Sequence, residues 1–545
     1  MRVSITYIIV DSMAMAETMR YKLSIAGDYF PDHPCPPDST SPTMTQATWI
    51  RSIGWSLTIF VLARWFSYYR RAPKVLAVGF WPVPYLGSWV AAIKFMLWPV
   101  DMVKEGIKKS KNGIFRIATL NDEFVLVTTK DKVAEYLKAS DSVLSMQDGA
   151  NDQQQIPFTM GFGVAYRTYH NIVVRKKITP SIPAFTPIMV DEISAALTQE
   201  IGTPQDYKPI TFYRAIAMTV ARTSNRVYVG KSLATHEAYL QNATDYAQAV
   251  VVSAEILRLV PHWLKSTVVK FLPVTTCMKK AVAYLGPQVE ERLSRKDSNR
   301  NREDDLLQWL LDEAPPIEKT VYQLVERVMA LNVASIHTTT MTFTAAIYSL
   351  ALEPEKYMDT LRDEVINSLE DGKISFGSIQ KLVHVDSFLR ESARYNVAGL
   401  MAMQRNAKQS FTFSDGTVIP AGAKVGAPTL ILQRDASSYE NPQDFEGFRF
   451  VSTRDGQPEL SKSMVTTGTD YHLYGHGRHP CPGRFFATHE MKILFATLLL
   501  RYDFKLKSGA KPQEIRIGTM AIPDTTLEVL FKAVPSLKTA TKLTA

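Results

Sequence analysis

The sequence predicts a mainly α-helical domain with small β-sheets, preceded by a segment of different character. From Ala91 onward the apolar residues recur mostly at helical spacing, and only short stretches alternate in the way that strands do. The chain has no internal repeat, and no Gly-rich or Ser-rich run divides it after residue 90. We therefore expect one large domain over residues 88–545 rather than a series of small ones.

The composition excludes several classes of protein. Hydrophobic residues make up 46% of the 545 residues and charged residues 21%, which is ordinary for a globular protein but not for a disordered, collagen-like or multi-span membrane chain. The net charge of +9 suits an acidic protein partner or an anionic membrane surface, and we expect no nucleic acid as a partner. The cysteines, Cys35, Cys277 and Cys481, are too few for a disulfide framework.

Residues 1–48 are expected to form a flexible extension. The apolar run from Val3 to Val10 ends at Asp11, which is too short for a membrane span or for a signal peptide of ordinary layout. Prolines then interrupt a polar stretch that cannot hold regular structure. They are Pro31, Pro34, Pro36, Pro37 and Pro42. An alternative is that the protein starts at Met44.

Residues 49–69 are expected to form a membrane-anchor helix. The stretch from Ser52 to Ala63 is apolar, although Arg51 and Arg64 border it and a full span needs about 20 apolar residues. Aromatic and then basic residues follow, as on the cytosolic side of many spans. They are Trp65, Phe66, Tyr68, Tyr69, Arg70, Arg71 and Lys74. We expect a single pass, a proline-containing hinge at 70–87 and a cytosolic domain; the alternative is a buried or interfacial helix.

Helical and strand patterns can be assigned along the large domain. Helical periodicity is present in Glu192–Ile201, Thr235–Leu257, Tyr322–Leu352, Glu353–Leu369 and Phe388–Tyr395. Strand patterns are present in Phe124–Thr128, in Ser410–Ala421 and within residues 511–533. The second of these alternates on both sides of Asp415-Gly416, which predicts a hairpin.

The most informative segment is residues 474–487, which read Tyr-Gly-His-Gly-Arg-His-Pro-Cys-Pro-Gly-Arg-Phe-Phe-Ala. Its glycines allow tight turns and the close approach of a flat ligand, and prolines on both sides of Cys481 stiffen the loop. An apolar helix is expected from Phe485 to Leu500. Cys481 then stands just before a helix N-terminus, where the dipole and free N–H groups would stabilise a thiolate.

Three interpretations of Cys481 are open from its surroundings. It can be a structural cysteine in a Gly-rich turn. It can bind zinc together with His476 and His479, although the loop lacks the paired cysteines of most zinc sites. It can hold the iron of a haem as a thiolate, with small residues that leave space for the ring.

In this loop the chain resembles the cytochrome P450 superfamily, and in particular its fungal members. The family pattern is Phe-x-x-Gly-x-Arg-x-Cys-x-Gly. Here Tyr474, Gly477, Cys481 and Gly483 fill the aromatic, glycine and cysteine positions, and His479 replaces the arginine. The resemblance covers roughly residues 85–533 and implies the cytochrome P450 fold. It also implies haem b as cofactor, Cys481 as the axial ligand of its iron, and His479 as a donor to a haem propionate.

A second part of the resemblance is the Glu-x-x-Arg helix motif, here Glu391-Ser-Ala-Arg394, whose spacing places both side chains on one helix face. The family continues with Pro-Glu-Arg-Phe, of which this chain keeps Arg449 and Phe450. The resemblance implies a buried network of Glu391, Arg394 and Arg449 with a structural role. The alternative is that Arg449 is an ordinary surface residue.

The long helix before this motif carries Ala-Ser-Ile-His-Thr-Thr at residues 334–339, where the family has Ala/Gly-Gly-x-Asp/Glu-Thr-Thr. The resemblance implies that Thr338 organises water and protons at bound oxygen, and its hydroxyl can bond back to a carbonyl and open the helix into a groove. His337 replaces the acid and is expected either to relay protons or to point away while water delivers them. The alternative is a threonine-rich face that only packs on its neighbours.

Two arginines are expected to bind the haem propionates. Arg175 matches the family's Trp-x-x-x-Arg segment, although Asn171 stands at the tryptophan position. Arg405 follows the Glu-x-x-Arg helix closely enough to reach the other propionate. A guanidinium suits a carboxylate because it donates two parallel hydrogen bonds. The alternative for each is an ordinary surface arginine.

The resemblance implies a haem-thiolate monooxygenase that inserts one atom of O2 into an apolar small molecule. NADPH-cytochrome P450 reductase would supply the electrons, and the anchor would hold the enzyme on the endoplasmic reticulum membrane. Residues 396–403 are mostly small or apolar and are expected to line a pocket for an apolar ligand. The motifs resemble those of fungal members that modify secondary metabolites, which implies that the substrate is a terpenoid, meroterpenoid or alkaloid intermediate.

Other functions stay open from the sequence alone. A haem-thiolate isomerase or dehydratase would need no reductase, so NADPH dependence would distinguish it. A haem protein without turnover would bind the cofactor and form no product. A membrane protein in which Cys481 is structural would bind no haem. The glycosylation pattern Asn242-Ala243-Thr244 also occurs often by chance.

Overall fold

The computed structural model describes residues 73–80, 86–120, 122–295, 303–397 and 399–534. The expected extension at 1–48 and the expected anchor at 49–69 lie outside these ranges, as does part of the expected hinge at 70–87. Within the described ranges, no helix combines the length and the apolar character that crossing a membrane requires.

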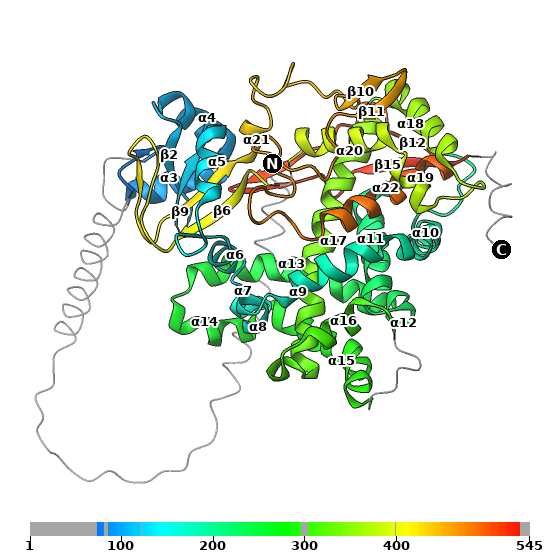
Figure 1. Cartoon of the computed structure of the whole chain (residues 1–545), viewed down its shortest axis with the longest axis horizontal. Helices are drawn as coiled ribbons and strands as arrows, with labels where there is room; N and C mark the ends of the chain where they lie inside the picture. Colours follow the sequence, from blue (N-terminus) through cyan, green and yellow to red (C-terminus); the bar gives the residue numbers. More distant parts are fainter. Residues whose placement is uncertain (1–72, 81–85, 121, 296–302, 398, 535–545) are drawn as a thin grey trace, which may run out of the picture. The chain divides into compact units, whose positions relative to one another are not determined.

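Helices dominate the described chain (Figure 1). Up to residue 268 they are α3 (Leu86–Leu97), α4 (Pro99–Lys109), α5 (Lys130–Lys138), α6 (Met146–Gln154), α7 (Ile156–Thr159), α8 (Phe162–Tyr166), α9 (Tyr169–Val173), the π-helical turn η1 (Val174–Ile178), α10 (Thr179–Glu200), α11 (Phe212–Tyr228), α12 (Lys231–Ala234), α13 (Glu237–Leu259) and α14 (His262–Val268). After it they are α15 (Pro273–Ser294), α16 (Leu306–Glu313), α17 (Val321–Leu352), α18 (Pro354–Ser368), α19 (Phe376–Gln380), α20 (Val383–Tyr395), α21 (Thr429–Leu432) and α22 (Arg484–Arg501).

The strands form small sheets beside the helices. The largest has the order β1-β2-β3-β9-β6-β4, and a second has the order β12-β15-β5. Three hairpins, β7-β8, β10-β11 and β13-β14, complete the set within the described residues. The strands are β1 (Leu76–Ala77), β2 (Ile114–Ala118), β3 (Glu123–Val127), β4 (Leu144–Ser145), β5 (Lys208–Thr211), β6 (Met401–Ala407), β7 (Phe411–Thr412), β8 (Val418–Ile419), β9 (Lys424–Pro428), β10 (Val451–Arg454), β11 (Gln457–Leu460), β12 (Tyr502–Leu506), β13 (Ile515–Ile517), β14 (Met520–Ile522) and β15 (Glu528–Ala533).

Helix α17 runs through the middle of the helical region (Figure 1) and packs against α11, α13, α15 and α20. The Thr320 hydroxyl caps its N-terminus by accepting a hydrogen bond from the backbone N–H of Gln323. Leu324, Phe343 and Ile347 are completely buried along it. A helix with apolar side chains on most of its faces is stable only inside a core, and this position fixes the residues halfway along α17.

The predicted fold class, mainly helical with small sheets, is confirmed. Helices α13, α17, α18 and α20 coincide with the expected helices to within a few residues, apart from an earlier start of α20 at Val383. Strand β3 coincides with the expected strand, and β7 and β8 form the expected hairpin. Its turn contains Gly416 at φ +83°, a conformation that favours glycine.

One helix is much longer than its periodicity suggests. The expected helix Glu192–Ile201 is the end of α10, which already begins at Thr179 and contains Pro183 and Pro187. Proline removes a backbone donor and is disfavoured in a helix interior, so local propensity does not predict a helix in this segment. Ile182 and Met189 are buried on α10, and tertiary packing of this kind outweighs propensity.

Candidate active site

Three segments contribute most of the wall of a cavity of about 350 Å³. They are α9 with η1, the middle of α17, and the loop that leads into α22. The cavity wall is mainly apolar and includes Val174, Leu331 and Phe486. Cys481 and Thr338 both lie on this wall, although they come from different segments. The predicted iron ligand and the predicted oxygen-handling threonine therefore face one shared space.

The loop around Cys481 is held by its own backbone. The N–H of Cys481 donates to the carbonyl of Tyr474 at 2.8 Å, and the Tyr474 hydroxyl, buried at the cavity wall, bonds that of Thr488 at 2.8 Å. Gly477 has φ +80°, a conformation that favours glycine. A β-carbon there would also lie 3.3 Å from Cβ of Leu137. These contacts present Cys481 at the cavity wall just before α22.

Opposing effects act on the pKa of Cys481. Burial raises the pKa of its thiol, and the backbone N–H groups of Gly483 and Arg484 lower it by a smaller amount. The expected N–H donors are in place, but the loss of solvation outweighs them. The side chain is nevertheless exposed on the cavity wall, so a thiolate at Cys481 stays a prediction. A coordinated metal cation is what holds such a thiol deprotonated.

Thr338 faces the cavity from the middle of α17. Its hydroxyl donates to the carbonyl of Ala334, one turn earlier, at 2.7 Å. The helix nevertheless stays continuous from Val321 to Leu352, so the predicted local opening into a groove is absent. The hydroxyl shares the carbonyl with the backbone N–H and does not displace it. The space beside Thr338 arises from the small side chain of Ala334 on the same face.

His337 points away from the cavity. It is not on the cavity wall, and its Nδ1 lies 3.3 Å from the hydroxyl of Tyr213 on α11. Its Nε2 is buried without a partner among the described residues. Burial lowers the pKa of His337, so the ring is neutral at pH 7. Of the two roles expected for this residue, the geometry favours the one in which water delivers protons.

The residues expected to bind the haem propionates lie apart and off the cavity wall. Arg175 is exposed on η1. His479 bonds the carboxylate of Asp141 at 2.8 Å. Arg405 on β6 is 5% exposed, and the one acceptor that the described residues offer it is the carbonyl of Gln404 at 2.8 Å. Burial lowers the pKa of Arg405.

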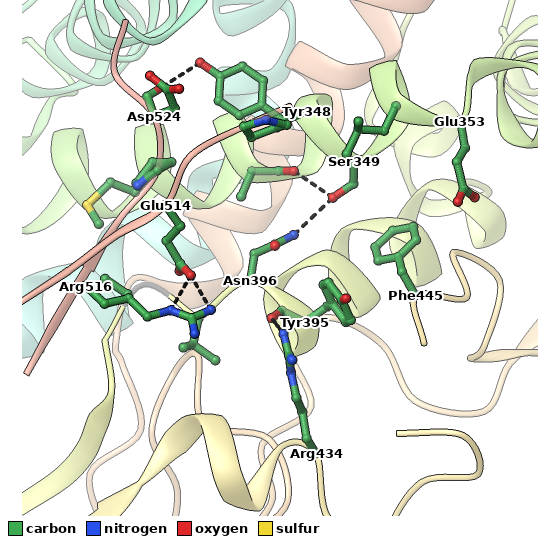
Figure 2. Close-up of a pocket in the computed structure, with 17 residues that line it drawn as sticks. Tyr348, Ser349, Glu353, Tyr395, Asn396, Arg434, Phe445, Glu514, Arg516 and Asp524 are labelled. Atoms are coloured by element: carbon green, nitrogen blue, oxygen red, sulfur yellow. Dashed lines mark hydrogen bonds and ion pairs between the residues drawn. The ribbon is translucent and has the colours of Figure 1, made fainter. Parts of the chain in front are cut away.

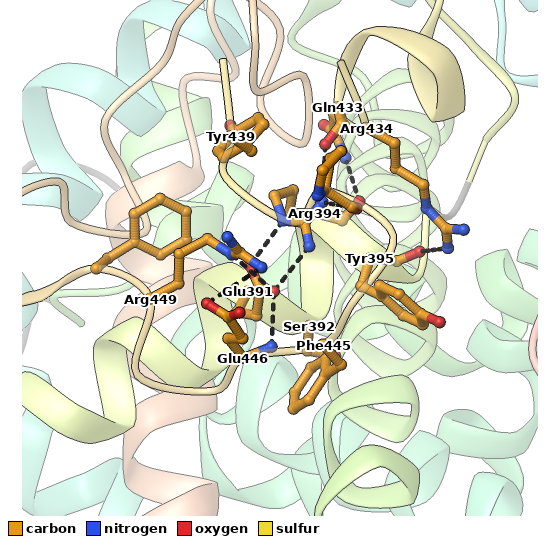
Figure 3. Close-up of polar contacts among 12 residues, drawn as sticks. Glu391, Ser392, Arg394, Tyr395, Gln433, Arg434, Tyr439, Phe445, Glu446 and Arg449 are labelled. Carbon is orange, nitrogen blue, oxygen red and sulfur yellow. Dashed lines mark hydrogen bonds and ion pairs between the residues drawn. The ribbon is translucent and has the colours of Figure 1, made fainter. Parts of the chain in front are cut away.

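The Glu-x-x-Arg pair is the centre of a buried network (Figure 3). Both oxygens of Glu391 accept hydrogen bonds from Arg394, at 2.7 and 2.8 Å, and Nε of Arg449 donates to Glu391 at 3.1 Å. Arg394 and Arg449 each also donate to the carbonyl of Asp444 at 3.0 Å. The structure thus brings together the three predicted residues, and their contacts tie α20 to the loop that follows α21.

Sequence reasoning missed a charged cluster beside the cavity. Arg327 on α17 is 1% exposed and bonds the fully buried carboxylate of Glu318. Its Nη1 lies 2.7 Å from Nδ1 of His170, and His170 and Asn171 line the cavity from α9. The available signal was an arginine within the mostly apolar sequence of α17, because such a residue has to find a buried partner.

A second cavity, of about 470 Å³, lies between the end of α17, the end of α20 and the β13-β14 hairpin (Figure 2). Many of the polar groups on its wall bond one another. Arg516 pairs with Glu514, and Arg434 donates to the carbonyl of Tyr395 at 2.7 Å. It is larger than the first cavity but holds no cysteine, so it is the weaker candidate for an active site.

The segment 396–403 is not placed as predicted. Among its described residues, Asn396 and Val397 line the second cavity and none lines the cavity of Cys481. The side chain of Asn396 donates to the hydroxyl of Ser349 at 3.0 Å, which holds the start of the segment at the far end of α17. The expectation that this segment lines the pocket beside Cys481 is therefore wrong for these residues.

The zinc interpretation of the loop finds no matching geometry. Nδ1 of His476 bonds Thr467 at 3.0 Å, and His479 bonds Asp141 rather than turning toward Cys481. In the part of the chain that the structure describes, no group of three or more His, Cys, Asp or Glu side chains is arranged to hold a metal ion.

The family model for Cytochrome P450 matches residues 79–531. The chain belongs to the cytochrome P450 family. Cytochrome P450 monooxygenase 151 of Postia placenta is 34% identical over 459 residues, which cover 82% of this chain and 91% of that protein. An ent-kaurene oxidase of Gibberella intermedia is 31% identical over 459 residues, 83% of this cytochrome P450 and 86% of the relative.

The solved structure of retinoic acid bound cyanobacterial CYP120A1 is similar to this cytochrome P450 with a TM-score of 0.64. The similarity covers 85% of this chain and 99% of that one, at 17% sequence identity, and it shows the shared fold. The predicted family, enzyme class and cofactor are therefore confirmed. The protein is a haem-thiolate monooxygenase that uses O2 and a redox partner and binds a small-molecule substrate.

The residues present fit a haem on two observations. Cys481 is on the wall of the cavity that Thr338 also lines. Arg405 is a buried guanidinium with a single acceptor among the described residues, whereas five N–H groups are available on each arginine. A buried cation with spare donors suits a carboxylate such as a haem propionate. Which residues hold the cofactor remains a prediction.

Proposed function

We propose that Cys481 is the axial ligand of the haem iron in this cytochrome P450. The structure describes two cysteines. Cys277 lies on α15 and is not on the cavity wall, whereas Cys481 is on that wall together with Thr338. This shared cavity is the single observation that carries the proposal.

The bound haem supplies the redox chemistry, in which one atom of O2 enters a C–H or C=C bond and the other leaves as water with two protons and two electrons. The protein binds the substrate, excludes bulk water and supplies the protons. Thr338 is suited to the last task. Its hydroxyl donates to Ala334, and its oxygen keeps lone pairs that accept a hydrogen bond from a water in the cavity.

Arg405 is the first candidate to hold a haem propionate, because its buried charge has spare donors. His479 and Arg175 are the further candidates. The imidazole of His479 bonds Asp141 at 2.8 Å, so its ring orientation is fixed beside the loop of Cys481. Arg175 is exposed on η1 and requires a side-chain rotation to approach the cavity.

The substrate that the site supports best is an apolar terpenoid. The mainly apolar wall favours a ligand without charge. Ent-kaurene oxidases are among the relatives that align with more than four fifths of this chain, and their name gives the substrate of those proteins. We infer that this cytochrome P450 oxidises a terpenoid of secondary metabolism, ahead of the meroterpenoid and alkaloid alternatives.

Membrane attachment through residues 49–69 and electron supply by NADPH-cytochrome P450 reductase are parts of the same proposal. An exposed apolar surface around α14 supports attachment. Leu259, Trp263 and Phe271 are 58%, 76% and 82% exposed, and Lys265 and Lys270 stand among them. Apolar side chains mixed with lysines are typical of surfaces that bind anionic lipid. The endoplasmic reticulum is the membrane that suits such a reductase.

The haem ligand is tested by the difference spectrum of the reduced, carbon-monoxide-bound protein. Wild type and Cys277→Ala are expected to give the red-shifted Soret band of a thiolate ligand, and Cys481→Ala is expected to lose it. The Cys277→Ala variant is the matched control because it removes the other described cysteine. A band that survives in Cys481→Ala would overturn the assignment.

The substrate class is tested by turnover of ent-kaurene with the reductase. We expect a product that contains one additional oxygen atom and forms only with NADPH. Product without NADPH would instead indicate the isomerase or dehydratase alternative. A normal thiolate band with no conversion of ent-kaurene or related hydrocarbons would remove the terpenoid proposal and leave the haem ligand intact.

A further inference from the structure

His170 is held in one tautomer by a buried arginine. Nη1 of Arg327 lies 2.7 Å from Nδ1 of His170, and a guanidinium can donate but not accept. Nδ1 is therefore the acceptor, and the ring proton is on Nε2. No residue in the described ranges accepts a hydrogen bond from this Nε2–H group. His170 thus carries a donor for which the protein itself provides no acceptor.

This donor belongs to a residue on the wall of the active-site cavity. His170 lines the same space as Cys481 and Thr338. Burial and the nearby charge of Arg327 lower the pKa of His170 to about 3. The ring therefore stays neutral at physiological pH, with its acceptor side toward Arg327 and its donor side left for a ligand.

The charges behind His170 favour an anion in front of it. Arg327 and Arg167 both bond the carboxylate of Glu318, so two positive charges share one negative charge. Arg327 also donates to the carbonyl of Arg167 at 2.6 Å and stacks over the ring of Tyr169 at 4.2 Å. These contacts fix the guanidinium and, through it, the orientation of the imidazole. A fixed donor loses little entropy when a ligand binds.

Glu326 is the other acid close to this cluster. Burial raises its pKa to about 7, so it is only partly ionised at neutral pH and cancels only part of the excess positive charge. An anion that enters the cavity can therefore accept a hydrogen bond from the neutral ring of His170, beside a cluster of side chains with a net positive charge. A hydrocarbon substrate has no atom to accept this hydrogen bond, whereas haem b carries two carboxylates.

We propose that His170 is a positioning residue for the cofactor, donating from Nε2 to a carboxylate of the haem while Arg327 fixes its ring. The inference rests on the proposed binding of haem at Cys481. It assigns to α9 a cofactor contact that is independent of Arg405, Arg175 and His479.

Two variants of His170 separate its outward donor from its contact with Arg327. In His170→Asn the amide oxygen can still accept from Arg327, but the short side chain places no N–H donor at the position of Nε2. In His170→Gln the longer side chain places an amide N–H at about the position of Nε2. Both are made in the full-length holoenzyme without substrate. The measurements are the rate of haem transfer to excess apomyoglobin and the midpoint potential of the iron.

We expect His170→Asn to lose haem about tenfold faster than wild type, the effect of one hydrogen bond to a charged group, and His170→Gln to stay within about threefold. The midpoint potential should fall in His170→Asn, because a less neutralised carboxylate stabilises the ferric state. If His170→Asn does not fold, His170→Phe replaces it, since it keeps a ring of similar size without the donor.

Unchanged haem loss and potential in both variants would overturn the proposal. Equal changes in haem loss and potential in His170→Asn and His170→Gln would also overturn it, because they would indicate that His170 only packs against its neighbours. An effect confined to the spectral affinity for ent-kaurene would overturn it as well, because it would indicate that His170 contacts the substrate by packing and not the haem. A failure of the haem-ligand proposal is recognised separately, because wild type would then lack the thiolate band.

Discussion

Arg394 and Glu391 form two parallel hydrogen bonds in which neither side chain is exposed to solvent at all. They stand one turn apart on α20, and the carboxylate also accepts from Arg449 and from the backbone N–H of Glu446. A charge pair buried this deeply is stable only while all of its members are present.

Neutralising Glu391 should therefore destabilise the enzyme strongly. We expect Glu391→Gln to lower the free energy of unfolding by roughly 3–5 kcal/mol, because Arg394 then remains completely buried without a counter-charge. Urea unfolding of the holoenzyme measures the change. Glu105→Gln makes the same substitution in the exposed pair of Glu105 and Lys109 and should change stability little. Equal losses in both variants would contradict the buried-pair interpretation.

Glu490 on α22 should make stability depend on pH. It is completely buried, Ser224 donates to its Oε1 at 3.3 Å, and its Oε2 has no partner among the described residues. Burial raises its pKa to about 8, whereas a carboxyl group in an unfolded chain titrates near 4.3. Between these values the folded state holds a proton that the unfolded state has released. The free energy of unfolding therefore falls as the pH rises from about 4.5 to about 8.

Glu490→Gln removes this dependence while it keeps an acceptor for Ser224. At about pH 8 we expect the variant to be more stable than wild type by roughly 4 kcal/mol, and at about pH 4.5 to be nearly equal to it. Unfolding curves at several pH values give the difference. A stability difference that stays constant over this range would show that the carboxyl group does not titrate as described.

Thr338 should control how much product the enzyme forms for each NADPH that it consumes. In Thr338→Ala we expect product formation to fall about tenfold or more, because the hydroxyl that orders a proton-donating water is lost, while the thiolate band is retained. The ratio of product to NADPH consumed measures the effect. Thr342→Ala is the matched control, since Thr342 also lines the cavity and its hydroxyl bonds the carbonyl of Thr338 at 2.8 Å. Equal ratios in the two variants would argue against a proton role.

His337 should be replaceable without a change in the pH profile of turnover. Its ring bonds Tyr213 and lies off the cavity wall, and burial lowers its pKa. His337→Asn keeps a polar partner for Tyr213 and removes the titrating ring. We expect turnover to retain its dependence on pH between about 5 and 8. A pH profile of turnover that changes in this range would indicate that His337 does relay protons.

Predictions that rest on local spacing agree with the structure. Glu391 and Arg394 are three residues apart on one helix, so their pairing follows from helical geometry. The glycines and prolines around Cys481 restrict the backbone of their own loop, so the place of the thiol just before α22 follows from residues close to it in sequence. The family pattern added the cofactor, which spacing alone does not specify.

What the sequence could not predict depends on contacts between distant segments. The partner that fixes the tautomer of His170 is 157 residues away. The orientation of His337 depends on Tyr213 on another helix. The raised pKa of the Cys481 thiol depends on the segments that pack around its loop. None of these follows from periodicity, because each is a product of tertiary packing.

The two long walls of the active-site cavity, α17 on one side and α9 with η1 on the other, differ in how easily they can move. Helix α17 is an unbroken rod that is packed on several sides, and bending it would strain many contacts at once. The opposite wall contains the π-helical turn η1, whose wider spacing can convert to an α-turn by shifting one residue. A ligand of different size will therefore be accommodated by movement of α9 and η1, and variants selected for new substrates should accumulate there rather than on α17.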